Sequence, residues 1–221
     1  MIAIVDYGRG NLGSVEKAFS RIGVPAVVTQ EARVVDDAEA VVLPGDGAFH
    51  DAMSSLEALG LLAAVRRAVD GARPFLGICL GYQLLFSTSE EFGEGRGLDV
   101  VPGAVRRFPQ GLKVPHMGWN QVAHDTGLRL FEGIPRGAHF YFVHSYYPDL
   151  AERADLAERA DLAERADPAV VRYAWCEYGV RFAAVIEHGL VMGTQFHPEK
   201  SQRWGFRLLE NFAGVVKDAP R

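Results

Sequence analysis

Cys79 is the residue most clearly suited to catalysis, because it lies within Gly-Ile-Cys-Leu-Gly at residues 77–81. The apolar run at residues 75–78 predicts a short buried strand, and the leucine pattern from Leu80 onward predicts a helix. A cysteine on the corner between them fits the sharp turn that holds a nucleophile. The flanking glycines let strand and helix approach closely, and the helix start favours a thiolate. The segment predicts a nucleophilic cysteine, with a core cysteine between packing glycines as the alternative.

A histidine and a glutamate two residues apart, His197 and Glu199, lie near the end of the chain on either side of Pro198. In an extended chain, residues at this spacing project to the same side. The carboxylate can then orient the imidazole while the other ring nitrogen faces a nucleophile. A lone histidine beside a strand end is more often structural, but together with the cysteine turn it predicts a Cys-His-Glu triad.

Two glycine-rich loops follow predicted strands. The loop at 44–49 follows a strand at 40–43, and open α/β sheets bind ligands at such carboxyl ends. Its backbone N–H groups could form an oxyanion hole, and an ordinary turn is the alternative. The other loop contains Gly8, Gly10 and Gly13, which fit Gly-x-Gly-x-x-Gly, with Glu31 near the place of a ribose-binding acid. A dinucleotide site is therefore an alternative, although nothing downstream resembles a hydride-transfer site.

Strands and helices alternate in the first half of the chain. Strands are expected at 2–5, 26–29, 40–43 and 75–78, and helices after Asn11 and at 51–69. This order predicts a parallel sheet with helices on both faces. The second half consists mainly of predicted strands with a hairpin around Gly189 and a closing helix; these elements lie at 105–108, 140–146, 170–175, 182–186, 190–194 and 204–216. We expect an α/β fold in one domain, residues 1–221, whose mostly parallel mixed sheet has an antiparallel portion in its second half.

A low-complexity segment at residues 149–167 contains three copies of Asp-Leu-Ala-Glu-Arg-Ala. Each Asp and Arg of a copy has the i, i+4 spacing that supports a helix. A six-residue period, however, puts the three leucines on different faces, so no single stripe can pack on a core. We interpret the segment as a solvated, partly helical insertion in a loop, and a dedicated binding finger is the alternative.

Composition excludes several classes of function. The net charge is −5 with no basic tract, which argues against nucleic acid as a partner. The N-terminus enters a predicted strand directly, so we expect no signal peptide, and no apolar run is long enough to span a bilayer. Cys79 and Cys176 lack the spacing of a metal site or a disulfide framework. We expect a cytoplasmic protein without a metal or another cofactor.

Two motifs carry a family resemblance: Gly-Ile-Cys-Leu-Gly-Tyr-Gln at 77–83 and Phe-His-Pro-Glu at 196–199. They resemble the class I, or triad, glutamine amidotransferases, which implies a three-layer α/β domain. Asp-Tyr-Gly at 6–8, the loop at 43–49, Pro-His-Met-Gly-Trp-Asn at 115–120 and Tyr-Phe-Val-His-Ser-Tyr at 141–146 are similar to the glutaminase subunits of imidazole glycerol phosphate synthase. The resemblance covers almost the whole chain except the repeat.

The resemblance implies hydrolysis of glutamine to glutamate and ammonia. Cys79 would be the nucleophile, His197 the proton shuttle and Glu199 its support. Backbone N–H groups of Leu80 and of the Gly45 region would form the oxyanion hole. The substrate glutamine would be held by Gly47, Gln83, Glu91 and the backbone at His144, Ser145 and Tyr146.

The resemblance also implies a partner, a (β/α)₈-barrel synthase subunit that receives the ammonia. Its docking face would include Asn11, Met117, Trp119, Asn120 and Lys200. We expect the isolated subunit to be nearly inactive until the partner's ligand switches it on. Asp46 departs from the valine of many relatives, and we expect its carboxylate to point to solvent.

Four alternatives stay open from the sequence. Another triad glutaminase, serving anthranilate or guanylate synthesis, would lack the Asp-Tyr-Gly and Pro-His-Met-Gly-Trp-Asn stretches. A cysteine peptidase or esterase could use a similar turn. A binding subunit with a relict site fits poorly, because all three triad positions are filled. The fourth alternative is a dinucleotide-binding module that uses the Gly-x-Gly-x-x-Gly loop.

Overall fold

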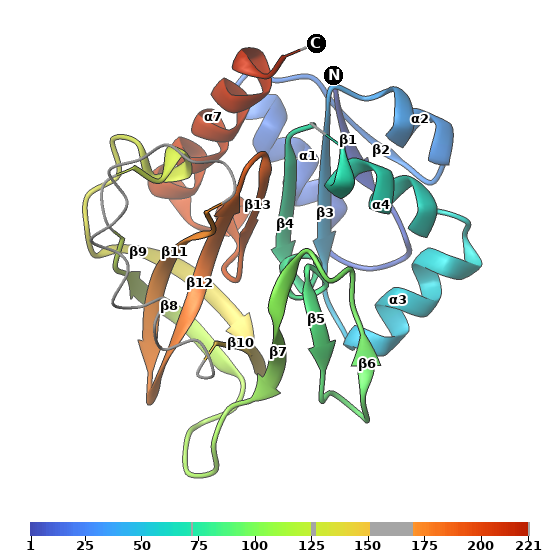
Figure 1. The fold of residues 1–221 in the computed structure, drawn as a ribbon. Helices are drawn as coiled ribbons and strands as arrows, with labels where there is room; N and C mark the ends of the chain where they lie inside the picture. The colour runs from blue at the N-terminus through green and yellow to red at the C-terminus, as the bar shows by residue number, and fades with distance from the viewer. Residues whose placement is uncertain (72, 125–126, 151–169, 221) are drawn as a thin grey trace.

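The computed structural model describes all residues except 72, 125–126, 151–169 and 221. Its centre is a seven-stranded sheet in the order β11-β12-β13-β4-β3-β1-β2 (Figure 1). Parallel pairing joins β2, β1, β3, β4 and β13, whereas β12 is antiparallel to β13 and to β11. The strands are β1 (Ile2–Val5), β2 (Ala26–Thr29), β3 (Ala40–Gly45), β4 (Phe75–Cys79), β11 (Arg172–Tyr178), β12 (Val180–His188) and β13 (Val191–Thr194). The expected mixed, mostly parallel sheet with an antiparallel second half is confirmed.

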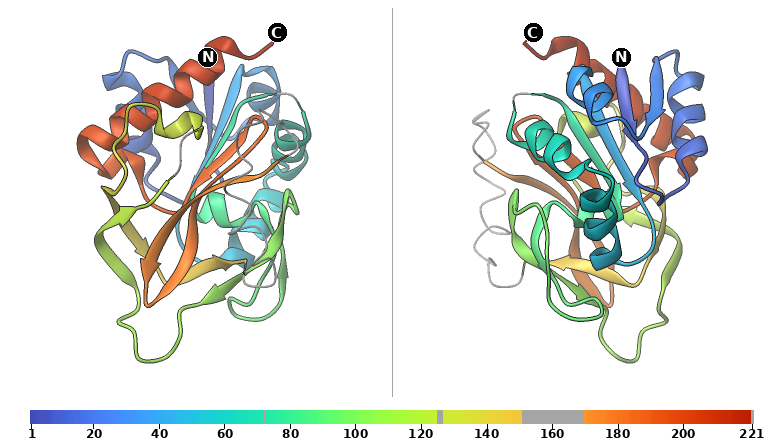
Figure 2. Two further views of the ribbon diagram at one scale, coloured as in Figure 1. Left: turned by 60° about the vertical axis from the view of Figure 1, so that its left-hand side comes forward. Right: turned by 90° about the vertical axis from the view of Figure 1, so that its right-hand side faces the viewer.

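Helices cover both faces of this sheet, which makes three layers (Figure 2). Helices α1 (Leu12–Arg21) and α7 (Gln202–Asp218) contact each other on one face. The opposite face carries α2 (Ala32–Asp37), α3 (Phe49–Ala58) and α4 (Leu62–Asp70). Alternate residues of β1 enter the two cores: Ile2 and Ile4 pack with the α1–α7 side, and Ala3 and Val5 with the α3–α4 side.

Two smaller sheets lie toward the carboxyl end of the central strands (Figure 1). A four-stranded sheet has the order β10-β7-β5-β6, and β8 and β9 form an antiparallel pair. These strands are β5 (Phe86–Ser89), β6 (Gly95–Arg96), β7 (Val101–Arg107), β8 (His116–Val122), β9 (Ala138–His144) and β10 (Tyr146–Asp149). The short helices are α5 (Leu80–Gln83), η1 (Arg129–Phe131) and η4 (Pro198–Lys200).

Most of the predicted elements are confirmed, and the exceptions have local causes. The helix expected at 51–69 is two helices, because Gly60, with φ +68°, breaks it between α3 and α4. The strand expected at 140–146 is two strands in different sheets, divided at Ser145. Helix α2 replaces an expected polar connection, and β5, β6 and β8 were not predicted.

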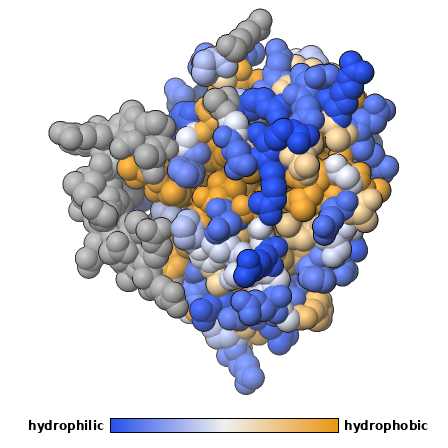
Figure 3. Space-filling model, turned by 45° about the vertical axis from the view of Figure 1, so that its right-hand side comes forward, coloured by the Kyte–Doolittle hydropathy of each residue, from blue (hydrophilic) through white to orange (hydrophobic). Residues whose placement is uncertain are grey.

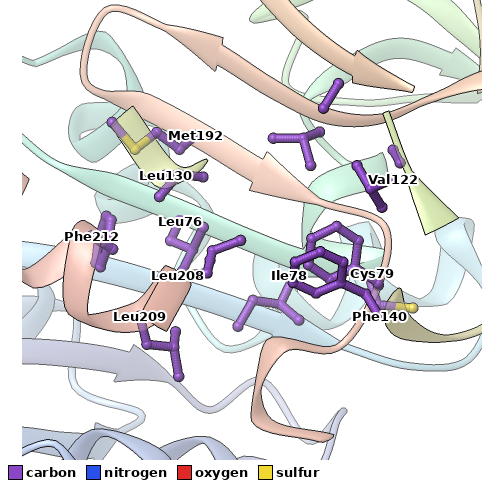
Figure 4. Close-up of a cluster of buried hydrophobic side chains, with 14 of the residues drawn as sticks. Leu76, Ile78, Cys79, Val122, Leu130, Phe140, Met192, Leu208, Leu209 and Phe212 are labelled. Carbon is purple, nitrogen blue, oxygen red and sulfur yellow. The ribbon is translucent and has the colours of Figure 1, made fainter. Parts of the chain in front are cut away.

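The hydrophobic cluster on the α7 side reaches Cys79. Leu76 and Ile78 of β4 pack there with Leu208 and Phe212 of α7, and Cys79 lies at the edge with its sulfur turned away from the α7 leucines (Figure 4). Outside the cores, the face in Figure 3 is mostly hydrophilic with smaller apolar areas between. Over the described ranges, no helix has the length and apolar character needed to cross a membrane. Most of the 149–167 repeat lies outside the described residues, so its interpretation as an insertion stays a prediction.

Candidate active site

Cys79 occupies a strained turn between β4 and α5. Its φ of 55° and ψ of −107° are a backbone conformation that residues with a side chain rarely adopt. The two flanking glycines are required sterically. A Cβ on Gly81 would lie 1.8 Å from the Leu43 carbonyl oxygen, and one on Gly77 would lie 2.7 Å from the Gly81 carbonyl oxygen. The predicted role of the glycines, a close approach of strand and helix around the cysteine, is confirmed.

His197 and Glu199 form a buried pair at the end of β13. The Nδ1 atom of His197 lies 2.8 Å from Oε1 of Glu199, and the side chains are only 9% and 2% exposed. The backbone N–H of His197 donates a hydrogen bond to the Tyr141 carbonyl at 2.9 Å, which connects the histidine to β9. Since Glu199 occupies Nδ1, the other ring nitrogen, Nε2, remains for the cysteine.

The electrostatics of His197 favour an imidazolium ion. Burial lowers the pKa of His197, but the nearby Cys79 and, after it, the hydrogen bond and charge of Glu199 outweigh burial and raise that pKa to about 10. A protonated imidazole beside a cysteine is the charge state that stabilises a thiolate. The arrangement can therefore generate a sulfur nucleophile and supply a proton beside it.

A cavity of about 450 Å³ joins Cys79 and His197 to most of the other residues singled out in the sequence. Asp46, Pro115 and Val143 line it as well, although the sequence did not single them out as site residues. Gly45, Glu199, Met117, Trp119 and Asn120 are not part of the lining. The predicted residues that do line the cavity are Asn11, Gly47, Cys79, Leu80, Gln83, Glu91, His144, Ser145, Tyr146, His197 and Lys200.

The glycine-rich loop lies directly beside the cysteine. Gly45 of β3 pairs with Cys79 of β4 in the parallel register. Leu80 is the first residue of α5, so its N–H has no partner within the helix. Asp46 is exposed, but its Oδ1 accepts a hydrogen bond from the Gly10 N–H at 3.0 Å, so the carboxylate contacts the neighbouring loop rather than only solvent. The one carboxylate of the glycine-rich loop is therefore engaged by the neighbouring loop that contains Gly10.

Glu91 links the cavity to helix α3. Its Oε2 accepts a hydrogen bond from the N–H of Phe49, the first residue of α3, at 2.7 Å. Burial raises the pKa of Glu91, and the bond from Phe49 opposes that shift. Helix α3, which follows the glycine-rich loop, thus fixes this carboxylate at the cavity. From its residue type alone, Glu91 would be expected at an ordinary surface position.

A chain of hydrogen bonds connects β8 to the cavity. His116 Nδ1 lies 2.9 Å from His144 Nε2, and His144 Nδ1 donates to the Tyr146 carbonyl at 2.7 Å. Burial lowers the pKa of His116 to about 4 and that of His144 to about 3, so both rings are neutral. The Gln83 amide also donates to the Tyr146 carbonyl, at 2.9 Å. These contacts fix the backbone at 144–146 that lines the cavity.

Comparison with known proteins agrees with this geometry. The family model described as glutamine amidotransferase class-I matches residues 3–214. The chain is 50% identical over 218 residues to the imidazole glycerol phosphate synthase subunit HisH of Moorella thermoacetica, covering 99% of this chain and 96% of that protein. The chain belongs to the class I glutamine amidotransferase family, and within it to the HisH proteins. The HisH protein of Aquifex aeolicus is 44% identical, over 95% of this amidotransferase and 94% of its own length.

Solved structures support the amidotransferase fold. A crystal structure of a glutamine amidotransferase aligns with a TM-score of 0.70 at 19% identity, covering 98% of this chain and 100% of that one. The glutaminase domain of Trypanosoma brucei CTPS with bound acivicin aligns with a TM-score of 0.65 at 16% identity, covering 100% of this chain and 94% of that one. At these identities the likeness shows the shared fold alone.

Two polar residues of this amidotransferase site were not singled out from the sequence, His116 and Gln195. His116 lies inside the motif at 115–120 that carried the family resemblance, and Gln195 directly precedes the motif at 196–199. Neither residue has a spacing that indicates its contact. Their partners come from other sheets or strands, so only the tertiary structure shows them. Within the described parts of the chain, no cluster of three or more His, Cys, Asp or Glu residues could hold a metal ion.

Proposed function

We propose that this chain is the glutaminase subunit of imidazole glycerol phosphate synthase. It hydrolyses L-glutamine to glutamate and ammonia, and the ammonia passes to a (β/α)₈-barrel synthase subunit that makes imidazole glycerol phosphate and an aminoimidazole ribonucleotide in histidine biosynthesis. The curated relatives named for this synthase match almost the whole chain. The observation that carries the chemistry is that His197, which lines one cavity with Cys79, forms a buried pair with Glu199.

The reaction begins with the Cys79 thiolate, which attacks the side-chain carbonyl carbon of glutamine. A carbon–sulfur bond forms, and the carbonyl oxygen becomes an oxyanion that the N–H groups of Leu80 and of the Gly45 region stabilise. Each such donor contributes roughly 10²–10³ in rate in measured oxyanion holes. The charged His197 gives its Nε2 proton to the amide nitrogen as the carbon–nitrogen bond breaks, which releases ammonia and leaves a thioester.

The second half of the reaction reverses the role of His197. The neutral imidazole removes a proton from water, which attacks the thioester carbon. The carbon–sulfur bond then breaks, glutamate leaves, and the thiolate–imidazolium pair is restored. Glu199 holds the ring in one orientation throughout and stabilises its charged form, since it contacts Nδ1 at 2.8 Å.

The substrate is held by residues that surround the sulfur. Glu91 suits the substrate's ammonium group, because its carboxylate is fixed at the cavity by Phe49. The backbone of Gly47 and of His144, Ser145 and Tyr146 supplies hydrogen-bonding groups on the same cavity. The Gln83 amide nitrogen already donates to two protein acceptors, so its oxygen is the atom that remains for the substrate.

The synthase subunit docks near β8, in our proposal. Met117 and Trp119 lie on this strand and are 61% and 46% exposed, an unusual degree for large apolar side chains. Lys200 is exposed and lies over the Tyr141 ring at 5.9 Å, and Asn11 lines the same cavity as Cys79. The side-chain amide of Asn120 donates to the Glu177 carbonyl at 3.0 Å. Asn120 therefore contributes its backbone in β8, rather than its side chain, to the proposed interface.

The decisive experiment measures ammonia from glutamine with the purified chain alone, with the cognate synthase subunit, and with that subunit and its nucleotide ligand. We expect little turnover alone and strong turnover in the liganded complex, lost in Cys79→Ala. Strong turnover by the chain alone would contradict activation by the partner. Hydrolysis of esters or peptides, or activation only by an anthranilate or guanylate synthase partner, would contradict the function itself.

A further inference from the structure

Gln195 stands next to the nucleophile in the central sheet. Strand β13 runs parallel to β4 with Thr194 paired to Ile78, so the following residues, Gln195 and Cys79, are neighbours at the carboxyl ends of the two strands. Gln195 is completely buried, and its Nε2 lies 3.8 Å from the Cys79 sulfur. This distance fits a hydrogen bond to sulfur, which is longer than one to oxygen. Cys79 is thus bordered by Gly45 on one side and by Gln195 on the other.

The orientation of the Gln195 side-chain amide can be deduced from the Tyr146 carbonyl, which can only accept hydrogen bonds. The Tyr146 carbonyl has no hydrogen, so the Gln83 side-chain atom 2.9 Å from it must be the amide nitrogen. The same nitrogen lies 3.0 Å from a Gln195 side-chain atom, which must then be the oxygen. Gln195 is left with its nitrogen toward the sulfur. The bonds that Gln83 donates to Tyr146 and to Gln195 therefore orient the Gln195 side chain so that its N–H group faces the Cys79 sulfur.

We propose that Gln195 is a positioning residue for the Cys79 nucleophile, one that donates a hydrogen bond to the thiolate and holds the sulfur beside the oxyanion loop. The neutral thiol has a different partner, because the Val143 carbonyl lies 3.9 Å from the sulfur and can accept an S–H bond. Of these two contacts to the sulfur, the one from the Gln195 N–H favours the anion over the neutral thiol. Loss of that donor therefore disfavours the thiolate relative to the thiol.

The inference depends on the proposed function only in that Cys79 is the reacting group. Its direct test is the pH dependence of Cys79 alkylation by iodoacetamide in the full chain, followed by peptide mass mapping to separate Cys79 from Cys176. The variants are Gln195→Glu, which replaces the donor by an acceptor of the same shape, and Gln195→Met, which removes it without adding charge. Gln110→Glu, an exposed position, controls for the added charge.

We expect the alkylation midpoint to rise by about one pH unit or more in Gln195→Glu, which is about a tenfold loss of thiolate below the midpoint. Gln195→Met should shift in the same direction by less, and Gln110→Glu should match the parent. In the synthase complex, the Gln195 variants should lose kcat with little change in KM. If Gln195→Glu fails to fold, Gln195→Met decides.

Alkylation midpoints that coincide with the parent in the folded variants would overturn the inference. A rise in KM at unchanged kcat would also overturn it, because it would place Gln195 on the substrate rather than on the sulfur. If the parent complex itself fails to hydrolyse glutamine, the proposed function fails, and the alkylation midpoints still decide the role of Gln195.

Discussion

The hydroxyl of Tyr7 lies so close to Gly45 that a Cβ added to the glycine would stand 2.1 Å from the Tyr7 oxygen. Tyr7 is buried, and its hydroxyl has no hydrogen-bond partner among the residues that the structure describes. Burial raises the pKa of Tyr7 far above its usual range, and the charges of Cys79 and Asp46 raise it further. The phenol therefore stays neutral, and it limits the space beside Gly45 in the glycine-rich loop at 44–49.

This contact predicts a coupled pair of substitutions. Tyr7→Phe removes a buried polar atom that makes no bond, so we expect stability to be unchanged or to rise by up to about 1 kcal/mol. Gly45→Ala alone should destabilise by roughly 1–3 kcal/mol through overpacking. Because phenylalanine lacks the clashing oxygen, the double variant should recover part of that loss.

Urea unfolding of the two single variants and the double variant measures this coupling. The expected interaction energy is favourable and about 0.5–3 kcal/mol, as for residues in direct contact. Additive effects would contradict the steric account of Tyr7. A Tyr7→Phe variant that unfolds more easily than the parent would show instead that the hydroxyl makes a stabilising bond.

The strain at Cys79 predicts an unusual order of stability between two inactive variants. Cys79→Ala and Cys79→Gly both remove the sulfur, and they differ by a single methyl group. Glycine normally destabilises relative to alanine, but at φ 55° and ψ −107° it relieves a conformation that costs about 1–3 kcal/mol. We expect a higher Tm for Cys79→Gly. Equal Tm values, or a lower one for glycine, would mean that the turn is not strained in solution.

The hexapeptide repeat predicts tolerance to deletion. Leu150 of the first copy is buried and lies near Gly103, where a Cβ would approach it to 3.0 Å. Deletion of residues 155–166 removes the other two copies and keeps this contact. Shortening a loop changes its closure entropy by only about 0.6 kcal/mol per halving of length, so glutaminase activity and Tm should stay close to the parent's. A large loss of either would indicate a functional role for the repeat.

The sequence predicts the central sheet well because its strands follow local rules. The apolar runs of β1, β3 and β4 are continuous, as expected for strands covered on both faces. Where prediction failed, tertiary contacts decide the local structure. Helix α5 has only four residues because the backbone after Leu84 joins the small sheet, with the Leu98 N–H donating to the Leu84 carbonyl at 2.7 Å.

The residues of the candidate site also fall into two groups, those that local sequence patterns predict and those that only tertiary contacts reveal. The proposed triad residues, Cys79, His197 and Glu199, could be found from turn chemistry and from a spacing of two. Ser145, in contrast, separates two strands because its carbonyl accepts from Phe108 of the segment after β7, a contact far away in the sequence. Gln195 was missed because its role depends on the register of two parallel strands and on the orientation of Gln83. Such contacts leave no periodic signal in the sequence.

The charged state of His197 leads to a prediction about pH. Its pKa is raised from 6.5 to about 10, against the lowering effect of burial, first by Cys79 and then by Glu199. A raised pKa means that the folded chain binds this proton more tightly than the unfolded chain. The group's own contribution to stability is therefore complete below about pH 6.5 and is lost as the pH rises toward 10.

The two anionic neighbours of His197 can be removed separately and the imidazole titrated by NMR. Since the larger share of the upward shift comes from Cys79, the midpoint should fall further in Cys79→Ala than in Glu199→Gln, and both should titrate below the parent. In Glu199→Gln, alkylation of Cys79 at neutral pH should also slow, because a less basic imidazole stabilises the thiolate less. A His197 midpoint near 6.5 in the parent, or one that Glu199→Gln lowers more than Cys79→Ala does, would contradict a thiolate–imidazolium pair in the resting site.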